Sequence, residues 1–345
     1  MTGTLDLNLP ALLAHLSDRG IEAAGPLSAD LLAGGRSNLT YAVTDGTSRW
    51  VVRRPPLAGV TASAHDMARE HRVTSAMYST SVPVARPISL CDDEKVLGAP
   101  FTVVEWVDGV VIRDREDLTA LSDDEVQRTT AALVHVLVSL HSVDVAAVGL
   151  EDFGRPTGFL ARQVALWRRQ WDLTRTRDLP DLERLHARLA DRVPAISEAS
   201  VVHGDYRIDN AMLDRADPGT IRAVVDWELS TLGDPLTDVA LMCVYRHPAL
   251  DVILGIPAAW TSPRLPSPDA LAESYARESG RDLGDWPFYL ALAHLKLAVI
   301  AEGIAHRAHA GADAGRDAKR AAEAVPGLVA AGLDVLGRRR TASDN

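Results

Sequence analysis

Two short polar segments, each placed directly after an apolar run, constrain this chain more than any other feature. The segment HGDYRIDN follows two valines, and DWELSTLGDP follows Ile221–Val225, which is rich in β-branched residues, so both apolar runs are predicted strands. Asp205 and Asn210 lie five positions apart, and Asp226 follows sixteen positions later. Phosphoryl transfer requires these groups, because one carboxylate accepts the hydroxyl proton while an amide and a second carboxylate serve as hard oxygen ligands for Mg²⁺.

The alternative is a pair of turns without chemistry, because Asp and Asn are common turn residues. Several matches at fixed spacing are hard to obtain from turn composition, which favours the catalytic interpretation. The later acids Asp234 and Asp238, in GDPLTD, are predicted to be structural. An Asp-Pro pair indicates a turn before a helix, where such side chains cap the helix or tie down the loop.

The first segment matches the kinase catalytic loop H-R-D-L-x-x-x-N at His203, Asp205 and Asn210, with Gly204 in place of the arginine. This form resembles the aminoglycoside phosphotransferase family and its choline kinase-like relatives. HGDYRIDN followed by VVDWELSTLGDPLTDVA looks most like the branch whose members occur alone or fused to acyl-CoA dehydrogenases. The resemblance extends from about residue 30 to residue 310.

The resemblance implies an α+β, two-lobed protein-kinase-like fold, with an N-terminal antiparallel β-sheet lobe and a larger, mainly α-helical C-terminal lobe. It implies ATP and Mg²⁺ as cofactors, Asp205 as catalytic base, and Asn210 and Asp226 as metal ligands. His203 is expected to position the loop. Arg207 occupies the place of a protein-kinase lysine that contacts the transferred phosphate, so we expect it to stabilise the same charge.

The chain has 345 residues, which is too long for one small core and suggests two domains. We expect a nucleotide-binding lobe at 1–107 and a catalytic and substrate-binding lobe at 108–340, with a helical insertion at about 155–195. Two cysteines cannot form a disulfide framework, and no signal segment or uninterrupted apolar run of membrane-spanning length is apparent. These features predict a cytoplasmic protein without a membrane partner, and they leave its oligomeric state open.

A net charge of −11 argues against nucleic-acid binding, where a basic face supplies most of the affinity. The segment 160–194 differs from the rest, because it contains eight arginines and five acidic residues. A solvated helical face with ion pairs is one explanation. The other is a surface for an anionic substrate formed by Arg168, Arg169 and Arg175.

Residues 31–54 read as short strands, with Asp45-Gly46 as a hairpin turn. The first strand pair bends at a glycine-containing segment, where a kinase-like lobe places the loop over the ATP phosphates. Its glycines allow close backbone approach and its amides can face the anion. A plain hairpin turn is the alternative. The candidate phosphate-binding residues are Gly34, Gly35, Ser37 and Asn38.

A kinase also needs a cation on its third strand to hold the α- and β-phosphates. No lysine precedes Lys95, so Arg53 is the candidate, and Arg54 competes with it. Strand alternation places Val51 on the face of Arg53, where it would cover the nucleotide base. Both arginines are solvated edge residues in the alternative interpretation.

The helix predicted at 61–78 supplies a partner for that cation. Glu70 lies on its apolar stripe with Met67, Thr74 and Met77. An acid on an apolar stripe is costly unless it is paired, so an ion pair of Glu70 with Arg53 would explain both residues. Display of Glu70 at the surface is the alternative.

Residues 87–97 and 101–107 read as a hairpin that ends the first lobe. The resemblance places the interlobe hinge at Glu105, Trp106 and Val107, where backbone groups read the adenine edge. Further along, Ser122–Glu125 is a capping box before a core helix, and His141 at its end is assigned to the buried core. Residues 260–275 read as loop-rich, and 288–311 as a long helix.

Together these features predict an enzyme, a small-molecule kinase that transfers the γ-phosphate of ATP to a hydroxyl group. The arginine-rich segment and the resemblance favour a hydroxylated acid or its acyl-CoA thioester as acceptor. An aminoglycoside is the first alternative, although such polycations would require an acidic cleft. A nucleotide-binding pseudokinase that acts by interaction is the second, because the strand lysine is missing and the glycine loop is irregular.

Overall fold

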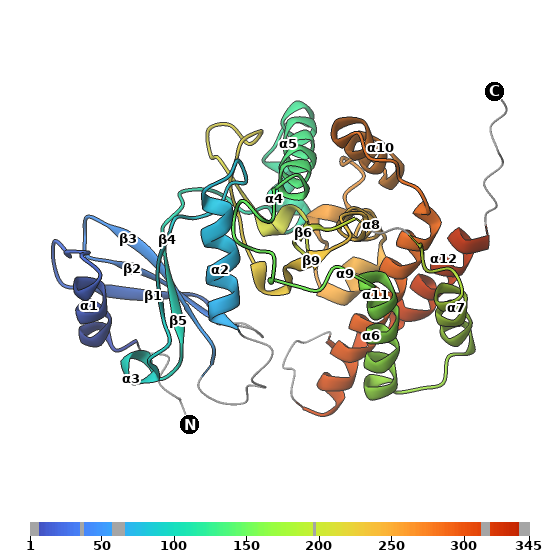
Figure 1. Ribbon diagram of the computed structural model, residues 1–345, viewed down its shortest axis with the longest axis horizontal. Coiled ribbons are helices and arrows are strands. Elements are labelled where there is room, and N and C mark those ends of the chain that lie inside the picture. The colour runs from blue at the N-terminus through green and yellow to red at the C-terminus, as the bar shows by residue number, and fades with distance from the viewer. Residues whose placement is uncertain (1–6, 35–37, 57–65, 196–197, 312–317, 338–345) are drawn as a thin grey trace.

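The protein has two lobes, seen side by side in Figure 1. This computed structural model describes residues 7–34, 38–56, 66–195, 198–311 and 318–337. An antiparallel sheet forms the N-terminal lobe and helices dominate the C-terminal lobe, so the predicted α+β, two-lobed fold is confirmed. Each lobe has its own hydrophobic core.

The N-terminal lobe contains a five-stranded sheet in the order β1-β2-β3-β5-β4, in which neighbouring strands are antiparallel. Helix α1 packs on its outer side, and α2 lies between the sheet and the other lobe (Figure 1). The elements are α1 (Leu9–Asp18), β1 (Ser28–Gly34), β2 (Leu39–Thr44), β3 (Arg49–Arg54), α2 (Met67–Tyr78), β4 (Pro87–Cys91), α3 (Glu94–Leu97) and β5 (Phe101–Glu105).

The turn between β2 and β3 forms where the Asp-Gly pair predicted it. The Asp45 carboxylate accepts hydrogen bonds from the amides of Thr47 at 2.8 Å and Ser48 at 2.6 Å. Gly46 has φ +91°, a left-handed conformation that glycine adopts without a Cβ penalty. The turn therefore fixes the register of β2 against β3, and with it the position of Arg53.

Strands β4 and β5 pair antiparallel as expected, but the hairpin is shorter than the sequence suggested. Between them Glu94–Leu97 forms the short helix α3. The Asp93 carboxylate accepts a hydrogen bond from the amide of Lys95, and Gly98 ends the helix at φ +82°. Strand β5 ends at Glu105, before the predicted limit at residue 107.

Helix α2 begins at Met67, where the side chain of Asp66 caps the amide of Arg69. The preceding residues of the predicted helix lie mostly outside the described residues. Glu70 and Met77 are buried, as the stripe predicted. Val73 and Met77 belong to the hydrophobic core of the C-terminal lobe, so α2 is shared between the lobes.

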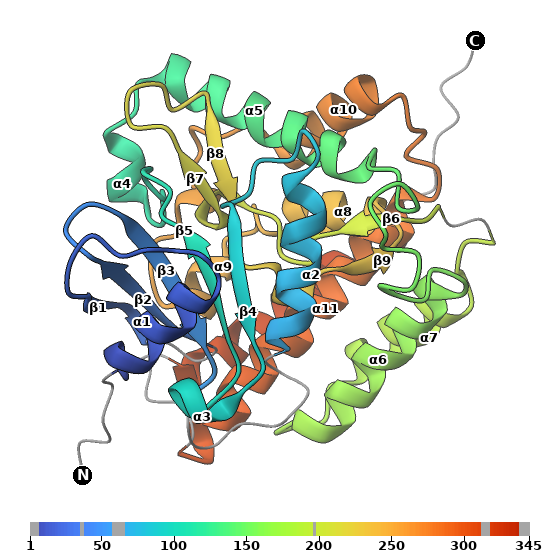
Figure 2. The ribbon, with the colours of Figure 1, turned by 60° about the vertical axis from the view of Figure 1, so that its left-hand side comes forward.

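The C-terminal lobe is built from helices of very different length, shown from a second side in Figure 2. The α-helices are α4 (Arg115–Thr119), α5 (Asp123–His141), α6 (Phe159–Thr174), α7 (Pro180–Ala190), α8 (Leu236–Val244), α9 (Ala249–Leu254), α10 (Pro268–Ser279), α11 (Trp286–His309) and α12 (Val325–Gly337). The short strands and 3₁₀ turns are β6 (Ser200–Val202), η1 (Ile208–Asn210), β7 (Ala211–Leu213), β8 (Ile221–Val224), η2 (Trp227–Leu229), β9 (Thr231–Gly233), η3 (Ala259–Thr261) and η4 (Ala318–Ala324).

The two predicted strands before the polar segments are present as β6 and β8, but they do not pair with each other. Strand β6 pairs with β9 and β8 pairs with β7, both antiparallel. The amide of Val225 donates a hydrogen bond to the carbonyl of Asn210 at 2.9 Å and brings the two segments together. The polar clusters therefore meet at one site.

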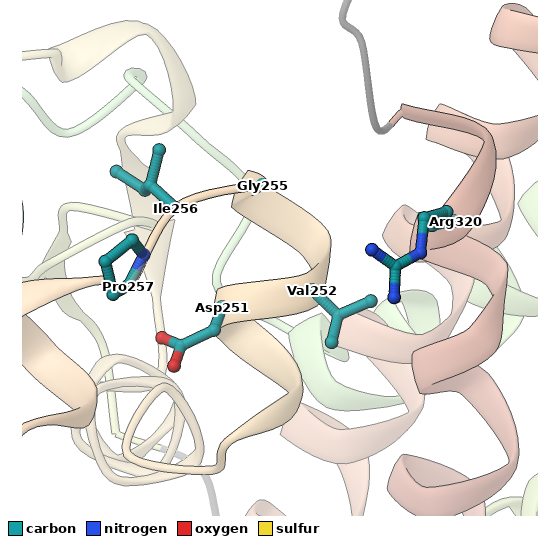
Figure 3. A pocket seen from close by; sticks show the side chains of 6 residues that line it. All are labelled: Asp251, Val252, Gly255, Ile256, Pro257 and Arg320. Atoms are coloured by element: carbon teal, nitrogen blue, oxygen red, sulfur yellow. The ribbon is translucent and has the colours of Figure 1, made fainter.

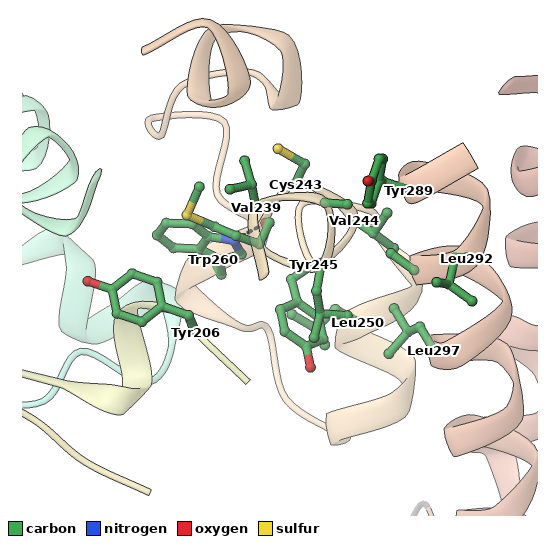
Figure 4. Packing of buried hydrophobic residues seen from close by; sticks show 14 of the residues in the cluster. Tyr206, Val239, Cys243, Val244, Tyr245, Leu250, Trp260, Tyr289, Leu292 and Leu297 are labelled. Atoms are coloured by element: carbon green, nitrogen blue, oxygen red, sulfur yellow. Dashed lines mark hydrogen bonds between the residues drawn. The ribbon is translucent and has the colours of Figure 1, made fainter. Parts of the chain in front are cut away.

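Helix α11 runs through the core of this lobe, where Leu292 and Leu297 pack near Tyr245 and Leu250 of the α8–α9 region (Figure 4). By length and composition α11 could cross a membrane, although His294 and Lys296 interrupt its apolar run as the sequence indicated. In the fold, 83% of its most apolar window is buried, as in a core helix.

Residues 260–275 are more ordered than the sequence suggested. Helix α10 begins at Pro268, where the hydroxyl of Ser267 accepts a hydrogen bond from the amide of Ala270 at 3.2 Å. This capping serine followed by a proline at the first helical position is a helix-start signal that the loop prediction overlooked.

Candidate active site

The catalytic-loop segment begins where β6 ends, and its backbone requires glycine. Gly204 has φ +85°, and a Cβ at this position would lie 2.8 Å from the carbonyl oxygen of Leu229. The next residue is Asp205. A larger residue at position 204 would therefore both strain the backbone and displace the neighbouring loop. This explains why glycine stands where protein kinases carry arginine.

His203 is fully buried beneath the loop and positions it, as predicted. Its Nε2 lies 3.0 Å from the carbonyl oxygen of Val225, and its Nδ1 lies 3.2 Å from the amide of Asp205. The two contacts are satisfied together when Nε2 donates and Nδ1 accepts. His203 thus joins the loop after β6 to the end of β8.

Asp238 ties down the same loop, which agrees with the structural role predicted for it. Its carboxylate accepts the amide hydrogens of His203 at 2.6 Å and Gly204 at 2.8 Å. His141 contacts the same carboxylate and the hydroxyl of Tyr275, so His141 is a buried and satisfied histidine as expected. Burial lowers the pKa of His141.

Asp234 is also structural. Its carboxylate accepts hydrogen bonds from the hydroxyl of Tyr289 at 2.9 Å and from the amide of Leu236 at 3.0 Å. It thereby fixes the start of α8 against α11.

Asp205 is held by groups from its own loop and from the end of α8. The Tyr245 hydroxyl, at the end of α8, donates to Oδ1, and the Asn210 side-chain amide donates to Oδ2 at 3.1 Å. Burial acts to raise the pKa of Asp205, but the charge of Arg207 and the Tyr245 hydrogen bond outweigh it, so the pKa lies below its usual value. The carboxylate is therefore ionised at neutral pH and able to accept a proton.

Arg207 lies between two carboxylates. Its Nε is 3.5 Å from Oδ1 of Asp205, and its Nη1 is 2.8 Å from Oδ2 of Asp209. Its guanidinium also stands over the ring of Tyr245 at 5.3 Å. Arg207 is thus next to Asp205, the predicted catalytic base, where it offsets the negative charge of both acids.

Asn210 and Asp226, the predicted metal ligands, lie on adjoining segments. Because the Asn210 amide nitrogen donates to Asp205, its oxygen remains as the donor for a cation. Asp226 has φ +66°, the one positive value among non-glycine residues in the described part of the chain. Such strain at an acid is characteristic of functional sites.

This donor set fits Mg²⁺. Across the described ranges, no group of three or more His, Cys, Asp or Glu side chains could hold a metal ion. One carboxylate and one amide oxygen are too few for an all-protein site, but they suit Mg²⁺, which keeps several waters and shares substrate phosphates. Asn210 and Asp226 would hold the ion, which would neutralise phosphate charge when bound.

Arg53 and Glu70 form the ion pair that the helix stripe predicted. Nη2 of Arg53 also lies 3.6 Å from Oδ1 of Asp226. Arg54 points to the opposite face of β3, where it is buried against Tyr41 and contacts the carbonyl of Pro55. Strand alternation therefore places Arg53, and not Arg54, at the junction of the lobes.

Glu70 is almost fully buried. Burial raises its pKa, whereas Arg53 acts in the opposite direction. Val51, half-buried, shares the face of Arg53 as predicted.

The remaining nucleotide-binding predictions fall partly outside the described residues. Gly34 ends β1 opposite Leu39, whereas Gly35 and Ser37 lie outside those residues. Asn38 is buried, and within the described chain neither its side-chain oxygen nor its nitrogen has a hydrogen-bond partner. A buried side-chain amide with an unsatisfied donor and acceptor is consistent with a ligand that binds next to Asn38.

The predicted hinge follows β5 into the second lobe. The amide of Glu105 donates to the carbonyl of Arg86 at 2.9 Å, and the amide of Trp106 donates to the carbonyl of Arg49 at 3.1 Å. The Glu105 side chain pairs with Arg86 at the surface. Val107 is the next residue, and adenine recognition by this segment stays a prediction.

A cavity of about 530 Å³ adjoins the catalytic loop between that loop, α6 and α11. Gly204 and Leu229 form part of its inner wall. Its lining from the two helices is mostly apolar, with two cations on α11, and includes Phe159, Leu166, Trp167, Leu292, Lys296, Ile300 and Arg307. This space is the candidate acceptor site.

The arginines proposed for an anion surface do not line that cavity. Arg168 pairs with Glu183 and lies 3.1 Å from Asp172, and Arg175 lies 3.3 Å from Asp178. Arg169 is exposed. The structure thus favours the alternative, a helical face with ion pairs.

Sequence reasoning missed two residues of the site, Tyr245 and Lys296. Both reach the catalytic loop from helices that follow it in the chain, 40 and 92 residues from their contacts in that loop. Neither belongs to a motif with fixed spacing. Lys296 offered a weak signal as a lysine within a mainly apolar helix.

A second cavity, of about 220 Å³, lies between α9 and η4 (Figure 3). It is lined by Asp251, Val252, Gly255, Ile256, Pro257 and Arg320. None of the predicted site residues lines it, so it is separate from the candidate active site.

Comparisons with known proteins agree with this geometry. The model of a family described as "Phosphotransferase enzyme family" (APH) matches residues 28–292. Acyl-CoA dehydrogenase family member 11 of Homo sapiens is 33% identical over 328 residues, which is 94% of this chain and 42% of the relative. The chain therefore spans less than half the length of that protein.

Two solved structures show the same fold. One, from Ralstonia eutropha and provisionally assigned as an aminoglycoside phosphotransferase, is 32% identical with a TM-score of 0.83, covering 96% of this chain and 99% of its own. The other is aminoglycoside phosphotransferase APH(4)-Ia in a ternary complex with AMP-PNP and hygromycin B. It is 16% identical with a TM-score of 0.61, covering 93% and 98%. With a family match over most of its length, the chain belongs to the APH phosphotransferase enzyme family.

Proposed function

We propose that the protein is an ATP- and Mg²⁺-dependent kinase that transfers the γ-phosphate to a hydroxyl of a small hydroxylated acid or its coenzyme A thioester. One observation carries the proposal. The carboxylate of Asp205, with a lowered pKa, contacts Asn210, and Asn210 is joined to the segment of Asp226, which faces the Arg53–Glu70 pair. This is the arrangement of a base beside a nucleotide and metal site.

Each residue has a role in this proposal. Asp205 orients the acceptor hydroxyl and takes its proton, while Tyr245 and Asn210 hold the carboxylate in place. Arg53, fixed by Glu70, binds the α- and β-phosphates. Arg207 stabilises negative charge beside the base. Catalysis then consists mainly of positioning and charge neutralisation.

Nucleotide use is supported by the AMP-PNP complex of the structural neighbour. A GDP complex of another neighbour makes GTP the nucleotide to compare with ATP. The acceptor class is supported by the cations Lys296 and Arg307 in an apolar cavity and by the names of the acyl-CoA dehydrogenase relatives. The same cavity is also lined by Glu228 and Asp238, so its lining has no excess of acids of the kind that a polycationic aminoglycoside would require.

The test is a screen of hydroxylated metabolites for ADP release in the presence of ATP and Mg²⁺. Asp205→Asn should lower turnover of the best acceptor by about a hundredfold or more, because it removes the general base. Asp108→Asn is the matched control, since Asp108 is exposed and pairs only at the surface with Arg215. Full turnover by Asp205→Asn would contradict the assignment of the base.

The pseudokinase alternative is tested separately by thermal denaturation. ATP with Mg²⁺ should raise the melting temperature more than ATP alone, because Asn210 and Asp226 supply the ligands that couple the metal to the nucleotide. This increment should be lost in Asp226→Asn. Stabilisation by ATP that is independent of Mg²⁺, with no turnover in the screen, would favour the pseudokinase.

A further inference from the structure

Lys296 lines the candidate acceptor cavity, and the roles proposed above for individual residues do not include it. It lies near the middle of α11, and its Nζ donates a hydrogen bond to the carbonyl oxygen of Gly204 at 2.7 Å. The ammonium also stands 5.7 Å from the ring centroid of Trp167 on α6. Lys296 therefore reaches from the wall of the cavity to the residue that precedes the catalytic base.

This ammonium has no direct carboxylate partner among the described residues, where Lys296 forms no ion pair within 4.0 Å. The two acids whose charge acts on Lys296, Asp205 and Asp238, already accept hydrogen bonds from other groups. Asp238 accepts two amide hydrogens of the loop, and Asp205 accepts hydrogen bonds from Tyr245 and Asn210. Burial lowers the pKa of Lys296, while Asp205 and Asp238 oppose this shift.

An ammonium group has three N–H donors, and the described structure supplies one acceptor, the Gly204 carbonyl. The walls formed by α6 and α11 are mainly apolar, with Phe159 and Ile300 as examples, and Trp167 offers the face of its ring. The acids that line the same cavity, Glu228 and Asp238, belong to other elements, η2 and α8. A desolvated cation without a paired anion is costly, and an oxygen-bearing ligand in the cavity would offset that cost.

We propose that Lys296 is the group that binds the acceptor. Its ammonium binds a carboxylate oxygen, or the carbonyl oxygen of a thioester, while the apolar walls hold the carbon chain of the same molecule. The hydrogen bond to Gly204 fixes this oxygen relative to Asp205, so Lys296 selects acceptors whose hydroxyl can reach the base. The inference rests on the proposed function for the identity of the reacting group.

The binding test uses two probes of equal length, octanoate and its neutral analogue octanamide, measured by calorimetry. The wild-type protein should bind octanoate about tenfold or more tightly than octanamide, as expected for a charge-assisted hydrogen bond. Lys296→Met should bring this ratio close to one, whereas Lys296→Arg should retain most of it. Lys95→Met is the matched control, because Lys95 is exposed on the N-terminal lobe.

A second measurement does not depend on a variant that folds well. The chain has three lysines, Lys95, Lys296 and Lys319, so ¹³C-dimethylation gives a small set of lysine signals in an NMR spectrum. Octanoate should shift the Lys296 signal and leave those of the other two in place. An unchanged Lys296 signal, or an octanoate preference that survives in Lys296→Met, would overturn the inference.

These outcomes are separable from failure of the proposed function. If no acceptor leads to ATP consumption but octanoate shifts the NMR signal of Lys296, the binding role of Lys296 is supported and the proposed kinase function is contradicted. If ADP release is found but Lys296→Met leaves both KM for the acceptor and the probe preference unchanged, the kinase assignment stands and Lys296 serves only to support the loop.

Discussion

The hydroxyl of Tyr245 donates a hydrogen bond to Oδ1 of Asp205, 2.5 Å away. The donor stays protonated, because burial and the neighbouring carboxylate raise the pKa of Tyr245 far above its usual value. In return the hydrogen bond lowers the pKa of Asp205. Tyr245 thus keeps the proposed base ionised.

We expect Tyr245→Phe to move the acid limb of the pH–rate profile upward by about one to two pH units, the equivalent of one hydrogen bond to a charged group. Without the hydroxyl the pKa of Asp205 rises, so a larger fraction of the base is protonated at acidic pH. The measurement is kcat/KM for ADP release against pH. Tyr206→Phe is the control, because that hydroxyl donates to the Leu133 carbonyl instead. Identical acid limbs in all three proteins would contradict this role.

Arg53→Met should weaken ATP binding by about tenfold or more, because it removes a cation at the lobe junction. It should also lower the melting temperature, because it leaves the buried Glu70 without its partner. Arg54→Met should lower the melting temperature and leave ATP affinity unchanged, since Arg54 is buried against Tyr41 in the core of the sheet. Calorimetry with ATP distinguishes the two variants. Loss of ATP affinity in Arg54→Met alone would exchange the two assignments.

Asp209 provides a test of stability against pH. Burial, opposed by Arg207, raises the pKa of Asp209 to about 6. The folded protein therefore binds more protons than the unfolded chain between pH 4 and pH 6, and this group's contribution to stability falls as the pH rises. In Asp209→Asn that fall is absent.

The free energy of unfolding of Asp209→Asn, relative to the parent, should increase by about 2 kcal/mol between pH 4 and pH 7. Comparing one protein with itself across pH removes any constant loss caused by the missing partner of Arg207. Urea denaturation at a series of pH values measures the difference. A difference that does not change with pH would show that Asp209 ionises normally.

The triple change of Arg168, Arg169 and Arg175 to Glu should leave KM for the acceptor unchanged. Arg168 and Arg175 are paired with acids on α6, α7 and their connection, so charge reversal creates like-charge contacts and should lower the melting temperature instead. Steady-state kinetics test the KM for the acceptor, and thermal denaturation of the same preparation tests the melting temperature. A raised KM for the acceptor would restore these arginines as an anion-binding surface.

The residues of the candidate site that belong to local sequence patterns could be predicted from the sequence. Asp205, Asn210 and Asp226 follow strand ends at fixed spacing, and strand alternation together with a helix stripe indicated Arg53 and Glu70. Such inferences work because period and spacing determine which side chains share a face.

The rest depends on contacts that no local pattern encodes. Tyr245 and Lys296 reach the catalytic loop through the packing of α8 and α11, and the direction of α6 decides that Trp167 lines the cavity while Arg168 pairs with neighbouring acids. Composition alone suggested an anion surface on α6, because a count of charges does not show which of them are already neutralised.

Helix α2 is fastened to the C-terminal lobe by more than apolar packing. Arg69 donates to the carbonyls of Phe153 at 2.6 Å and Ser230 at 3.1 Å, and Arg72 donates to the carbonyl of Gly149 at 2.8 Å. Glu70 lies on the same helix, whereas Arg53 belongs to the sheet. The Arg53–Glu70 pair therefore links a strand of the N-terminal sheet to a helix that is hydrogen-bonded to the C-terminal lobe. The position of the Arg53 guanidinium thus depends on how both lobes are placed, and not on the sheet alone.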